Sequence, residues 1–263
     1  KLKNIKAFVT MYLGGCCNYN YDFFKLKKKL NCYMIEDACH ALGADYKIKN
    51  RYYKIGSCKH ADVSTFSLHP VKSITTGEGG IVTTNKKEIF NKIISYRSHG
   101  IKRNKDKHWD YDIVNSGYNF RLSDINCSLG LSQLKKLNKI IKKRRLIARQ
   151  YNSLLKNLDY ISIPKINKNI NSSWHLYILL IDFKKLKKKK VDLFNYFKKR
   201  NIRLQQHYIP TNKYSLYKTK IPGKFQNSLS YFNKTVSLPI HYNCTNKDIV
   251  SIVNKLKKFL KLN

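Results

Sequence analysis

The stretch Phe66-Ser67-Leu68-His69-Pro70-Val71-Lys72-Ser73-Ile74-Thr75-Thr76-Gly77-Glu78-Gly79-Gly80 decides how this chain is interpreted. It places Lys72 between an apolar run that ends in a hydroxyl, at Ser67, and a glycine-rich turn. Upstream, a second apolar run ends in two acids, Glu36 and Asp37. A lysine that is partly removed from water loses its proton more easily and becomes an amine nucleophile, as a Schiff base requires. Lys72 is therefore the candidate reactive residue.

The composition indicates a folded globular protein that is unusually basic. A chain of 263 residues with 42% apolar residues can bury a substantial core. The formal charge of +38 would ordinarily suggest nucleic acid or an anionic surface as a partner. The lysines, however, are scattered and accompany many Asn, Ile and Tyr residues, as an AT-rich coding sequence would produce. Because no RNP, KH or zinc-finger pattern accompanies them, we expect no nucleic-acid partner.

The cysteines and the apolar runs bear on the cellular compartment. Seven cysteines occur without a CxxC pair and without metal-ligand spacing, which favours free thiols and no metal site. There is no signal-peptide pattern and no run of about eighteen apolar residues. We therefore expect a soluble cytoplasmic protein that does not bind a membrane.

The first half of the chain alternates between strand and helix patterns. Residues 7–13 and 33–35 are apolar and β-favouring, and residues 21–30 between them have helical spacing. Such a βαβ unit predicts parallel strands with ligands beyond their carboxyl ends, where Asp37 lies. Two short strands, 63–67 and 80–84, are expected to flank the Lys72 loop. A helix over residues 86–96 is expected next.

A long helix and a smaller unit are predicted for the rest of the chain. Apolar residues recur at helical spacing over residues 122–155. This spacing predicts one long helix, with a bend left open, and Ser123 as its N-cap. A polar stretch over residues 159–171 then indicates a boundary. Beyond it we expect a strand over 173–182 and helices over 191–200 and 245–260, the last with Thr245 and Asp248 as a capping pair.

The candidate site residues supply four kinds of chemical group at one edge of the expected sheet. Asp37, His40, Ser67 and Lys72 provide an acid, an aromatic nitrogen, a hydroxyl and an amine. Pyridoxal 5'-phosphate (PLP) needs a carboxylate at its pyridine nitrogen, a lysine at its aldehyde, and hydroxyls and backbone amides at its phosphate. A lone aspartate at a strand end more often caps a turn than serves a site. The combination of groups therefore carries the assignment.

Several motifs together resemble a known family. They are residues 35–44 (IEDACHALGA), 66–72 (FSLHPVK), 75–80 (TTGEGG), 97–100 (RSHG) and 117–122 (GYNFRL), followed by 172–177 (SSWHLY), 207–210 (HYIP) and 237–240 (SLPI). The chain closely resembles the nucleotide-sugar aminotransferases of the DegT/DnrJ/EryC1/StrS family, and among them the branch that serves pseudaminic acid synthesis. The resemblance implies an α/β PLP-dependent transferase of fold type I. Its incomplete large domain, with a mainly parallel sheet and the long connecting helix, would span 1–158, and a small α+β domain would span 159–263.

The same resemblance implies roles for individual residues. Lys72 would hold the cofactor aldehyde and carry the proton, Asp37 would face the pyridine nitrogen, and Ser67 would bind the phosphate. His40 would lie near the phenolic oxygen, and Asn119 would reach the phosphate from a neighbouring subunit, which implies a homodimer with shared active sites. The substrate candidates are His69, Arg97, His99, His207 and Tyr208. His69 could instead have a structural role. Arg97 and His99 could instead stabilise the end of a helix. The glycines of the turn, Gly77, Gly79 and Gly80, are expected to serve backbone geometry first.

The resemblance also implies the reaction. An amino group would pass from an amino-acid donor, L-glutamate, to the C4 ketone of a UDP-linked 4-keto-6-deoxy-N-acetylhexosamine. Two alternatives stay open: another nucleotide-linked ketosugar of the perosamine type, and an inactive remnant. Members of the family begin with a further third of the large domain, and no counterpart is found before Lys1. We therefore expect a fragment or a lost front part, and exposed sheet surface as its cost.

Overall fold

The computed structural model describes residues 4–217, 223 and 225–262. They form two compact units: Lys1–Lys139 with Asn167–Ser173, and Ile140–Ile166 with Trp174–Asn263. This division differs from the expected domains 1–158 and 159–263. The reason is that most of the long helix α4 (Leu137–Leu155) buries its apolar side in the core of the second unit.

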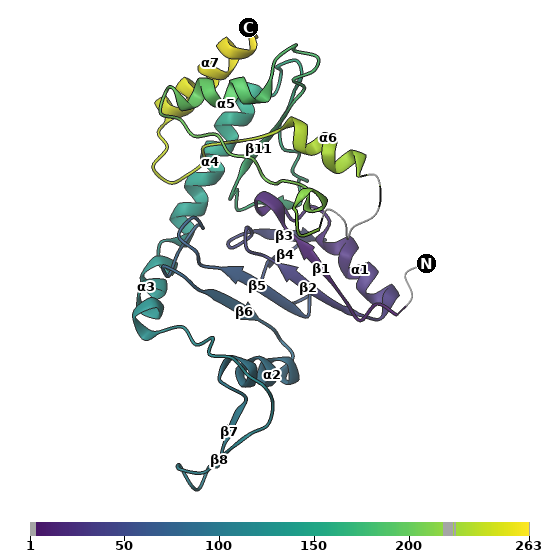
Figure 1. Ribbon diagram of the computed structural model, residues 1–263, viewed down its shortest axis with the longest axis vertical. Coiled ribbons are helices and arrows are strands. Elements are labelled where there is room, and N and C mark those ends of the chain that lie inside the picture. Colours follow the sequence, from purple (N-terminus) through teal and green to yellow (C-terminus); the bar gives the residue numbers. More distant parts are fainter. Residues whose placement is uncertain (1–3, 218–222, 224, 263) are drawn as a thin grey trace. The chain divides into compact units, whose positions relative to one another are not determined.

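A four-stranded sheet forms the centre of the first unit. Its strands are β1 (Ala7–Met11), β2 (Tyr33–Asp37), β5 (Val63–Ser67) and β6 (Gly80–Thr83), in the order β1-β2-β5-β6 (Figure 1). The first three are parallel, and β6 is antiparallel to β5. The short helix η1 (Leu13–Gly15) and helix α1 (Asn20–Leu30) connect β1 to β2. The predicted βαβ unit and mainly parallel sheet are confirmed.

Two hairpins and two helices complete this unit. Strands β3 (Asp45–Ile48) and β4 (Arg51–Lys54) form a hairpin that β10 (Ile170–Asn171) extends. The second hairpin pairs β7 (Ile101–Arg103) with β8 (Tyr111–Ile113). Helix α2 (Lys87–Arg97) precedes it and α3 (Asp124–Leu134) follows it. The sequence pattern predicted both helix regions but neither hairpin.

The prediction of one helix over 122–155 is wrong, because α3 and α4 are separate helices interrupted at residues 135–136. The predicted cap is confirmed: the Asn126 amide donates to Ser123 Oγ at 3.3 Å and begins α3. The two segments share helical spacing, but they pack in different places. Helix α3 belongs to the first unit and buries none of its residues, whereas α4 packs into the second.

The second unit packs helices against a small antiparallel sheet. The sheet order is β12-β11-β9, formed by β12 (Thr235–Leu238), β11 (Tyr177–Ile181) and β9 (Ile161–Ser162). The remaining elements are α5 (Lys190–Lys198), η2 (Thr211–Lys213), α6 (Gln226–Lys234) and α7 (Asn246–Leu260). Helix α7 begins with the predicted Thr245–Asp248 capping box. The strand expected from residue 173 begins only at Tyr177, since Trp174 has a left-handed backbone with φ 51°.

Two further features concern the chain as a whole. All seven cysteines are free thiols, as predicted. Among the described residues, no helix combines the length and the apolar character needed to cross a bilayer.

The packing of α7 gives a stability prediction for the second unit. Leu256 is fully buried, so Leu256→Ala should lower the free energy of unfolding by about 2–5 kcal/mol. Leu216 is exposed, so Leu216→Ala should change it by no more than about 0.5 kcal/mol. Urea denaturation followed by circular dichroism measures both. Equal effects of the two variants would contradict the assigned core.

Candidate active site

Parallel pairing brings the ends of β2 and β5 to one edge of the sheet. Asp37, the last residue of β2, lies opposite Thr65, and β5 ends two residues later at Ser67. Because the two strands run in the same direction, their carboxyl ends and the loops that follow meet at this edge. The loop after Ser67 carries Lys72.

Hydrogen bonds fold the Lys72 loop back on itself. The Lys72 amide donates to the His69 carbonyl at 2.9 Å, and the Thr76 amide donates to the Leu68 carbonyl at 3.1 Å. Gly79 closes the loop with φ 150°, and a Cβ on it would lie 2.6 Å from Thr76 Oγ1. Glycine is therefore required at this position for backbone geometry, which agrees with the expected role of the turn.

The environment of Lys72 favours loss of its proton. Burial lowers the pKa of the half-buried Lys72 ammonium group, while the charges of Cys39 and Asp37 act in the opposite direction. Among the described residues, no carboxylate forms an ion pair with Lys72. The charge of Asp37 therefore influences the Lys72 amine, but the two side chains do not form an ion pair. This is the environment of an amine nucleophile.

Two groups of Cys39 border the Asp37 carboxylate. The Cys39 amide donates to Asp37 Oδ1 at 3.2 Å. The Cys39 thiol also hydrogen-bonds with Asp37, and a thiol is a weak donor. A carboxylate held by one backbone amide and one weak donor retains capacity to accept from a protonated ring nitrogen, as PLP presents.

Cys39 is a site residue for which the sequence analysis assigned no role. Its thiol has a pKa raised to about 11, first by burial and then by the hydrogen bond and charge of Asp37. Lys72 and a backbone hydrogen bond from Ser67 oppose the shift. The thiol therefore stays protonated near neutral pH and does not compete with the amine as a nucleophile. Its position two residues after Asp37 could have indicated this proximity.

His40 and Ser67 are held by backbone groups. His40 is buried, its Nδ1 accepts a hydrogen bond from the Gly14 amide at 3.3 Å, and its carbonyl accepts from Ser173 Oγ at 2.6 Å. Ser67 Oγ accepts from the His69 amide at 3.3 Å. Ser67 thus lies at the start of the Lys72 loop, and His40 is held against Gly14 and Ser173. The roles of both toward a cofactor stay predictions.

Glu36 forms a buried network that the sequence analysis missed. Tyr12 Oη and Asn20 Nδ2 donate to Glu36 Oε1 at 2.8 and 2.9 Å, and Ser64 Oγ donates to Oε2. Burial, followed by the charge of Glu36, raises the pKa of the Tyr12 hydroxyl. These hydrogen bonds connect the N-cap of η1, helix α1 and strand β5 to β2 at Glu36, the residue before Asp37. Strand alternation is the signal that could have found it, since neighbours on a strand face opposite sides.

Among the substrate candidates of the first unit, His69 lies nearest to Lys72 in the chain. Its side chain is exposed, with Nδ1 accepting from the Val71 amide at 3.3 Å and Nε2 lying 3.6 Å from a Glu78 carboxylate oxygen. These contacts keep the imidazole on the loop that carries Lys72. They are compatible with both the structural and the substrate role.

Arg97, His99 and Asn119 form a second group. Ser98 and Asn119 make a β-bridge, the His99 amide donates to the Tyr118 carbonyl at 2.9 Å, and the Phe120 amide donates to the Arg97 carbonyl at 2.9 Å. All three candidates are exposed. Within the described residues, these contacts join the segments around Arg97, His99 and Asn119 to one another and not to Lys72.

His207 and Tyr208 belong to the second unit. His207 Nδ1 is hydrogen-bonded to Ser237 Oγ at 2.7 Å, and its ring meets the exposed Tyr208 ring edge to face at 4.7 Å. The two side chains form one polar and aromatic surface on this unit. Their part in substrate binding stays a prediction.

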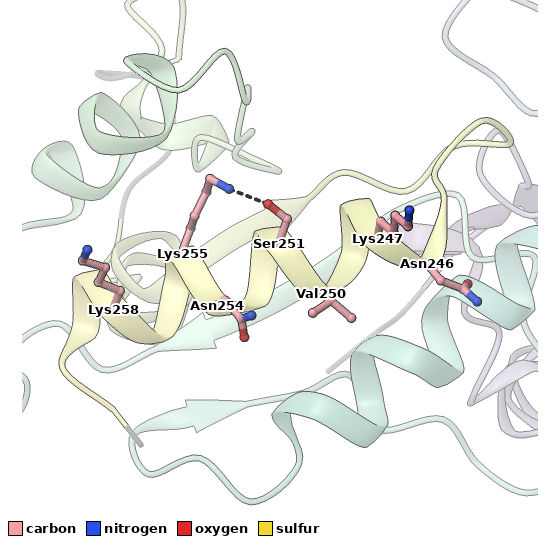
Figure 2. Close-up of a pocket in the computed structure, with 7 residues that line it drawn as sticks. All are labelled: Asn246, Lys247, Val250, Ser251, Asn254, Lys255 and Lys258. Atoms are coloured by element: carbon pink, nitrogen blue, oxygen red, sulfur yellow. Dashed lines mark hydrogen bonds between the residues drawn. The ribbon is translucent and has the colours of Figure 1, made fainter.

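A groove of about 620 Å³ lies on the exposed side of α7 (Figure 2). Its lining consists of Asn246, Lys247, Val250, Ser251, Asn254, Lys255 and Lys258, and Lys255 Nζ donates to Ser251 Oγ. No carboxylate or imidazole lines it. The groove therefore lacks the acid and amine pair found at Asp37 and Lys72.

The sequence model of the DegT/DnrJ/EryC1/StrS aminotransferase family matches residues 4–257. The chain belongs to this family. Its members are PLP-dependent sugar aminotransferases, so the predicted family, enzyme class and cofactor are confirmed. The groups that Asp37, Ser67 and Lys72 offer fit that cofactor.

Curated relatives are longer than this chain. The UDP-4-amino-4,6-dideoxy-N-acetyl-β-L-altrosamine transaminase of Campylobacter jejuni serotype O:2 is 41% identical over 97% of this chain and 68% of its own length. An uncharacterised protein of Methanocaldococcus jannaschii is 38% identical over 98% of this chain and 68% of its own length.

Solved structures of the family share the fold. Helicobacter pylori PseC, an aminotransferase of pseudaminic acid biosynthesis, matches with a TM-score of 0.87 and 32% identity over 97% of this chain and 67% of its own. A candidate sugar aminotransferase of Streptococcus pneumoniae, solved in a PLP form, matches with a TM-score of 0.80 and 25% identity. The match covers 97% of this chain and 68% of the Streptococcus pneumoniae chain. The expected fold type I architecture is thereby confirmed.

The pairing of Lys72 with Asp37 predicts a measurable change in acidity. Since the charge of Asp37 raises the pKa of Lys72, Asp37→Asn should lower that pKa further. The reaction of Lys72 with an amine-acylating reagent, followed by mass spectrometry across pH, should reach its plateau at lower pH in the variant. Asp110→Asn, in an exposed turn, is the control. An unchanged pH profile in Asp37→Asn would contradict the proximity of the two groups.

Proposed function

We propose that the chain transfers an amino group from an amino acid, L-glutamate, to the C4 ketone of a UDP-linked 4-keto-6-deoxy-N-acetylhexosamine, in pseudaminic acid-type biosynthesis. The substrate class is supported by two Campylobacter jejuni transaminases that are 40% and 41% identical to this chain and are named for the corresponding UDP-amino sugar. The observation that carries the chemistry is the half-buried Lys72 with a lowered pKa, under the influence of the Asp37 charge.

The side chains of the site would divide the binding of PLP among them. The bound cofactor supplies a protonated ring that withdraws electrons from the reacting carbon. Asp37 Oδ2 would hold the proton of the ring nitrogen, while Ser67 Oγ and loop amides would hold the phosphate. The aldehyde would be attached to Lys72 Nζ. His40, fixed by the Gly14 amide, would border the phenolic oxygen.

Lys72 would then carry protons in both halves of the reaction. Burial lowers the pKa of Lys72, which favours the neutral amine that can accept a proton. It would remove the proton from the α-carbon of the amino-acid donor and later deliver a proton to C4 of the sugar. The donor product would leave before the sugar binds, which gives ping-pong kinetics.

The exposed apolar residues of the first unit support a homodimer with shared active sites. Trp109, Phe120, Ile125 and Leu131 are all largely exposed, and they lie along the segment that runs from the turn of hairpin β7–β8 into helix α3. Several exposed large apolar residues in one segment favour an interface. Asn119 lies next to Phe120 in this region. It would therefore reach the partner's cofactor phosphate, as the family motif implies.

We also propose a reducing, cytoplasmic location. This is supported by the seven cysteines, none of which forms a disulfide.

A second candidate substrate is a GDP-linked ketosugar. The GDP-perosamine synthase of Escherichia coli O157:H7 is 27% identical over 97% of this chain. A panel of UDP-, dTDP- and GDP-linked 4-ketosugars separates the two candidates, and turnover of the GDP-linked sugar alone would replace the first proposal by the second.

Lys72 should be the residue that forms a covalent link with the cofactor. Borohydride reduction after incubation with PLP should fix the label at Lys72, and Lys72→Ala should abolish both the label and transamination. Lys190 is the matched control, because burial lowers its pKa to about 8 but Asp37 does not act on it. Lys190→Ala should keep the label, located by peptide mass spectrometry. A label at Lys190, or none at either lysine, would refute the assignment.

The shared site predicts complementation between two inactive variants. Lys72→Ala and Asn119→Ala should each lose activity, and mixed subunits should regain part of it, since one of the two sites in a mixed dimer contains both native residues. Turnover after unfolding and refolding the mixture measures this. Mixing Lys72→Ala with Asp37→Ala should regain nothing, because both residues come from the same subunit. Equal recovery in both mixtures would argue against a shared site.

A further inference from the structure

The loop that carries Lys72 leaves β5 and returns to β6 along a covered path. The Leu68 amide donates to the Gly79 carbonyl at 2.9 Å and closes the base of the loop. Residues 76–79, which we call the returning limb, lead back to β6. Thr76 in this limb is only 1% exposed, so the limb packs against another part of the first unit.

Helix α3 and the residue before its cap provide this cover. A Cβ on Gly79 would lie 2.9 Å from Leu122 Cδ1, and a Cβ on Gly130 would lie 2.8 Å from Thr76 Cγ2. Leu122, Asn126 and Gly130 are spaced four residues apart, so they lie on one side of the helix. They are also less exposed than the residues on either side of them. This side of α3 therefore rests on the returning limb.

Asn126 joins the helix to the limb by a hydrogen bond. Its Nδ2 donates to the carbonyl of Thr76, which is 50 residues away in the sequence. Its Oδ1 accepts from Ser123 Oγ, and its backbone amide donates to the same oxygen at 3.3 Å. A backbone carbonyl can only accept, so the nitrogen of the Asn126 side chain must face Thr76.

The start of α7 shows what this helix position does when it serves the helix alone. Asn126 is the third residue of α3, and Asp248 is the third residue of α7. Asp248 Oδ2 accepts from the Thr245 amide at 2.8 Å, so its side chain turns back onto its own cap. Asn126 directs its Nδ2 to the loop instead. A carboxylate has no donor and could serve the cap but not the Thr76 carbonyl.

The hydrogen bonds of the loop connect this contact to Lys72. The Thr76 amide donates to the Leu68 carbonyl at 3.1 Å, and Thr75 Oγ1 donates to the same carbonyl at 2.8 Å. Within the span between Leu68 and Thr76, the Lys72 amide donates to the His69 carbonyl at 2.9 Å. A displacement of Thr76 would therefore act on both ends of the short span that carries Lys72.

We infer that Asn126 is a positioning residue for Lys72: its side-chain amide holds the returning limb on α3 and thereby fixes the loop that presents the amine. The contact acts through the backbone of Thr76, so Asn126 need not touch substrate or cofactor. The inference deepens the proposed function and rests on it for the reactive role of Lys72. The contact itself can be tested without the cofactor.

Two variants separate the loop contact from the helix. Asn126→Asp removes the donor to Thr76 but gives, with Ser123, the Ser-x-x-acid spacing of a capping box. Gly130→Ala adds a methyl group toward Thr76 Cγ2 without adding a charge, and alanine favours a helix more than glycine does. Helix α3 should therefore stay folded in both variants, while the returning limb loses its contact.

Acylation of Lys72 across pH, followed by mass spectrometry, reports the position of the loop in the chain without PLP. Burial lowers the pKa of Lys72, and the charges of Cys39 and Asp37 oppose this effect. A displaced loop gives the ammonium group more water, so both variants should move the plateau of acylation to higher pH, by about half a pH unit or more. Lys190 is the internal reference, because burial lowers its pKa to about 8 in the second unit. Asn254→Asp, the same change of charge on α7, should move neither profile.

Hydrogen exchange shows where the change occurs. In both variants, peptides that cover residues 68–80 should exchange about tenfold faster than in the wild type. Peptides that cover α3 and α7 should keep the wild-type rate. This pattern would assign the effect to the loop and not to the stability of the helix.

Three results would overturn the inference. Unchanged acylation and exchange in both variants would mean that the loop does not depend on Asn126. A shift in Asn126→Asp without one in Gly130→Ala would assign the effect to the added charge. Loss of protection in α3 together with the loop would make Asn126 a structural residue of the helix. Borohydride labelling of the wild type with PLP is a separate measurement, so an absent label at Lys72 would refute the proposed function and leave these results intact.

Discussion

The candidate site depends on the parallel register between β2 and β5. Asp37, the last residue of β2, pairs with Thr65, two residues before the end of β5, and this places the carboxylate and the Lys72 loop at one edge of the sheet. Because side chains alternate along a strand, a slip of one residue would turn Asp37 toward the buried side and bring Glu36 to the open one. The Glu36 network opposes such a slip, since Tyr12, Asn20 and Ser64 all donate to its carboxylate.

The two neighbouring acids therefore have different tasks that follow from their surroundings. Glu36 is buried and accepts three side-chain hydrogen bonds, which fix β2 against η1, α1 and β5. Asp37 is half-buried and accepts one hydrogen bond from the Cys39 amide. A buried carboxylate without donors would be costly, so the fold supplies donors to Glu36. Asp37 has only the amide and the weakly donating thiol of Cys39 beside it and can therefore serve a ligand.

Much of this arrangement could be predicted from the sequence because it depends on local signals. Strand and helix periodicity gave the βαβ unit, the glycines gave the turn after Lys72, and the Thr245–Asp248 spacing gave the α7 cap. The interruption at 135–136 could not be predicted, because helical spacing continues across it while the packing partner changes from one unit to the other. The closeness of Cys39 to Asp37 follows from their spacing, but its interaction with Lys72 depended on the fold of the loop, since it joins two segments far apart in the chain.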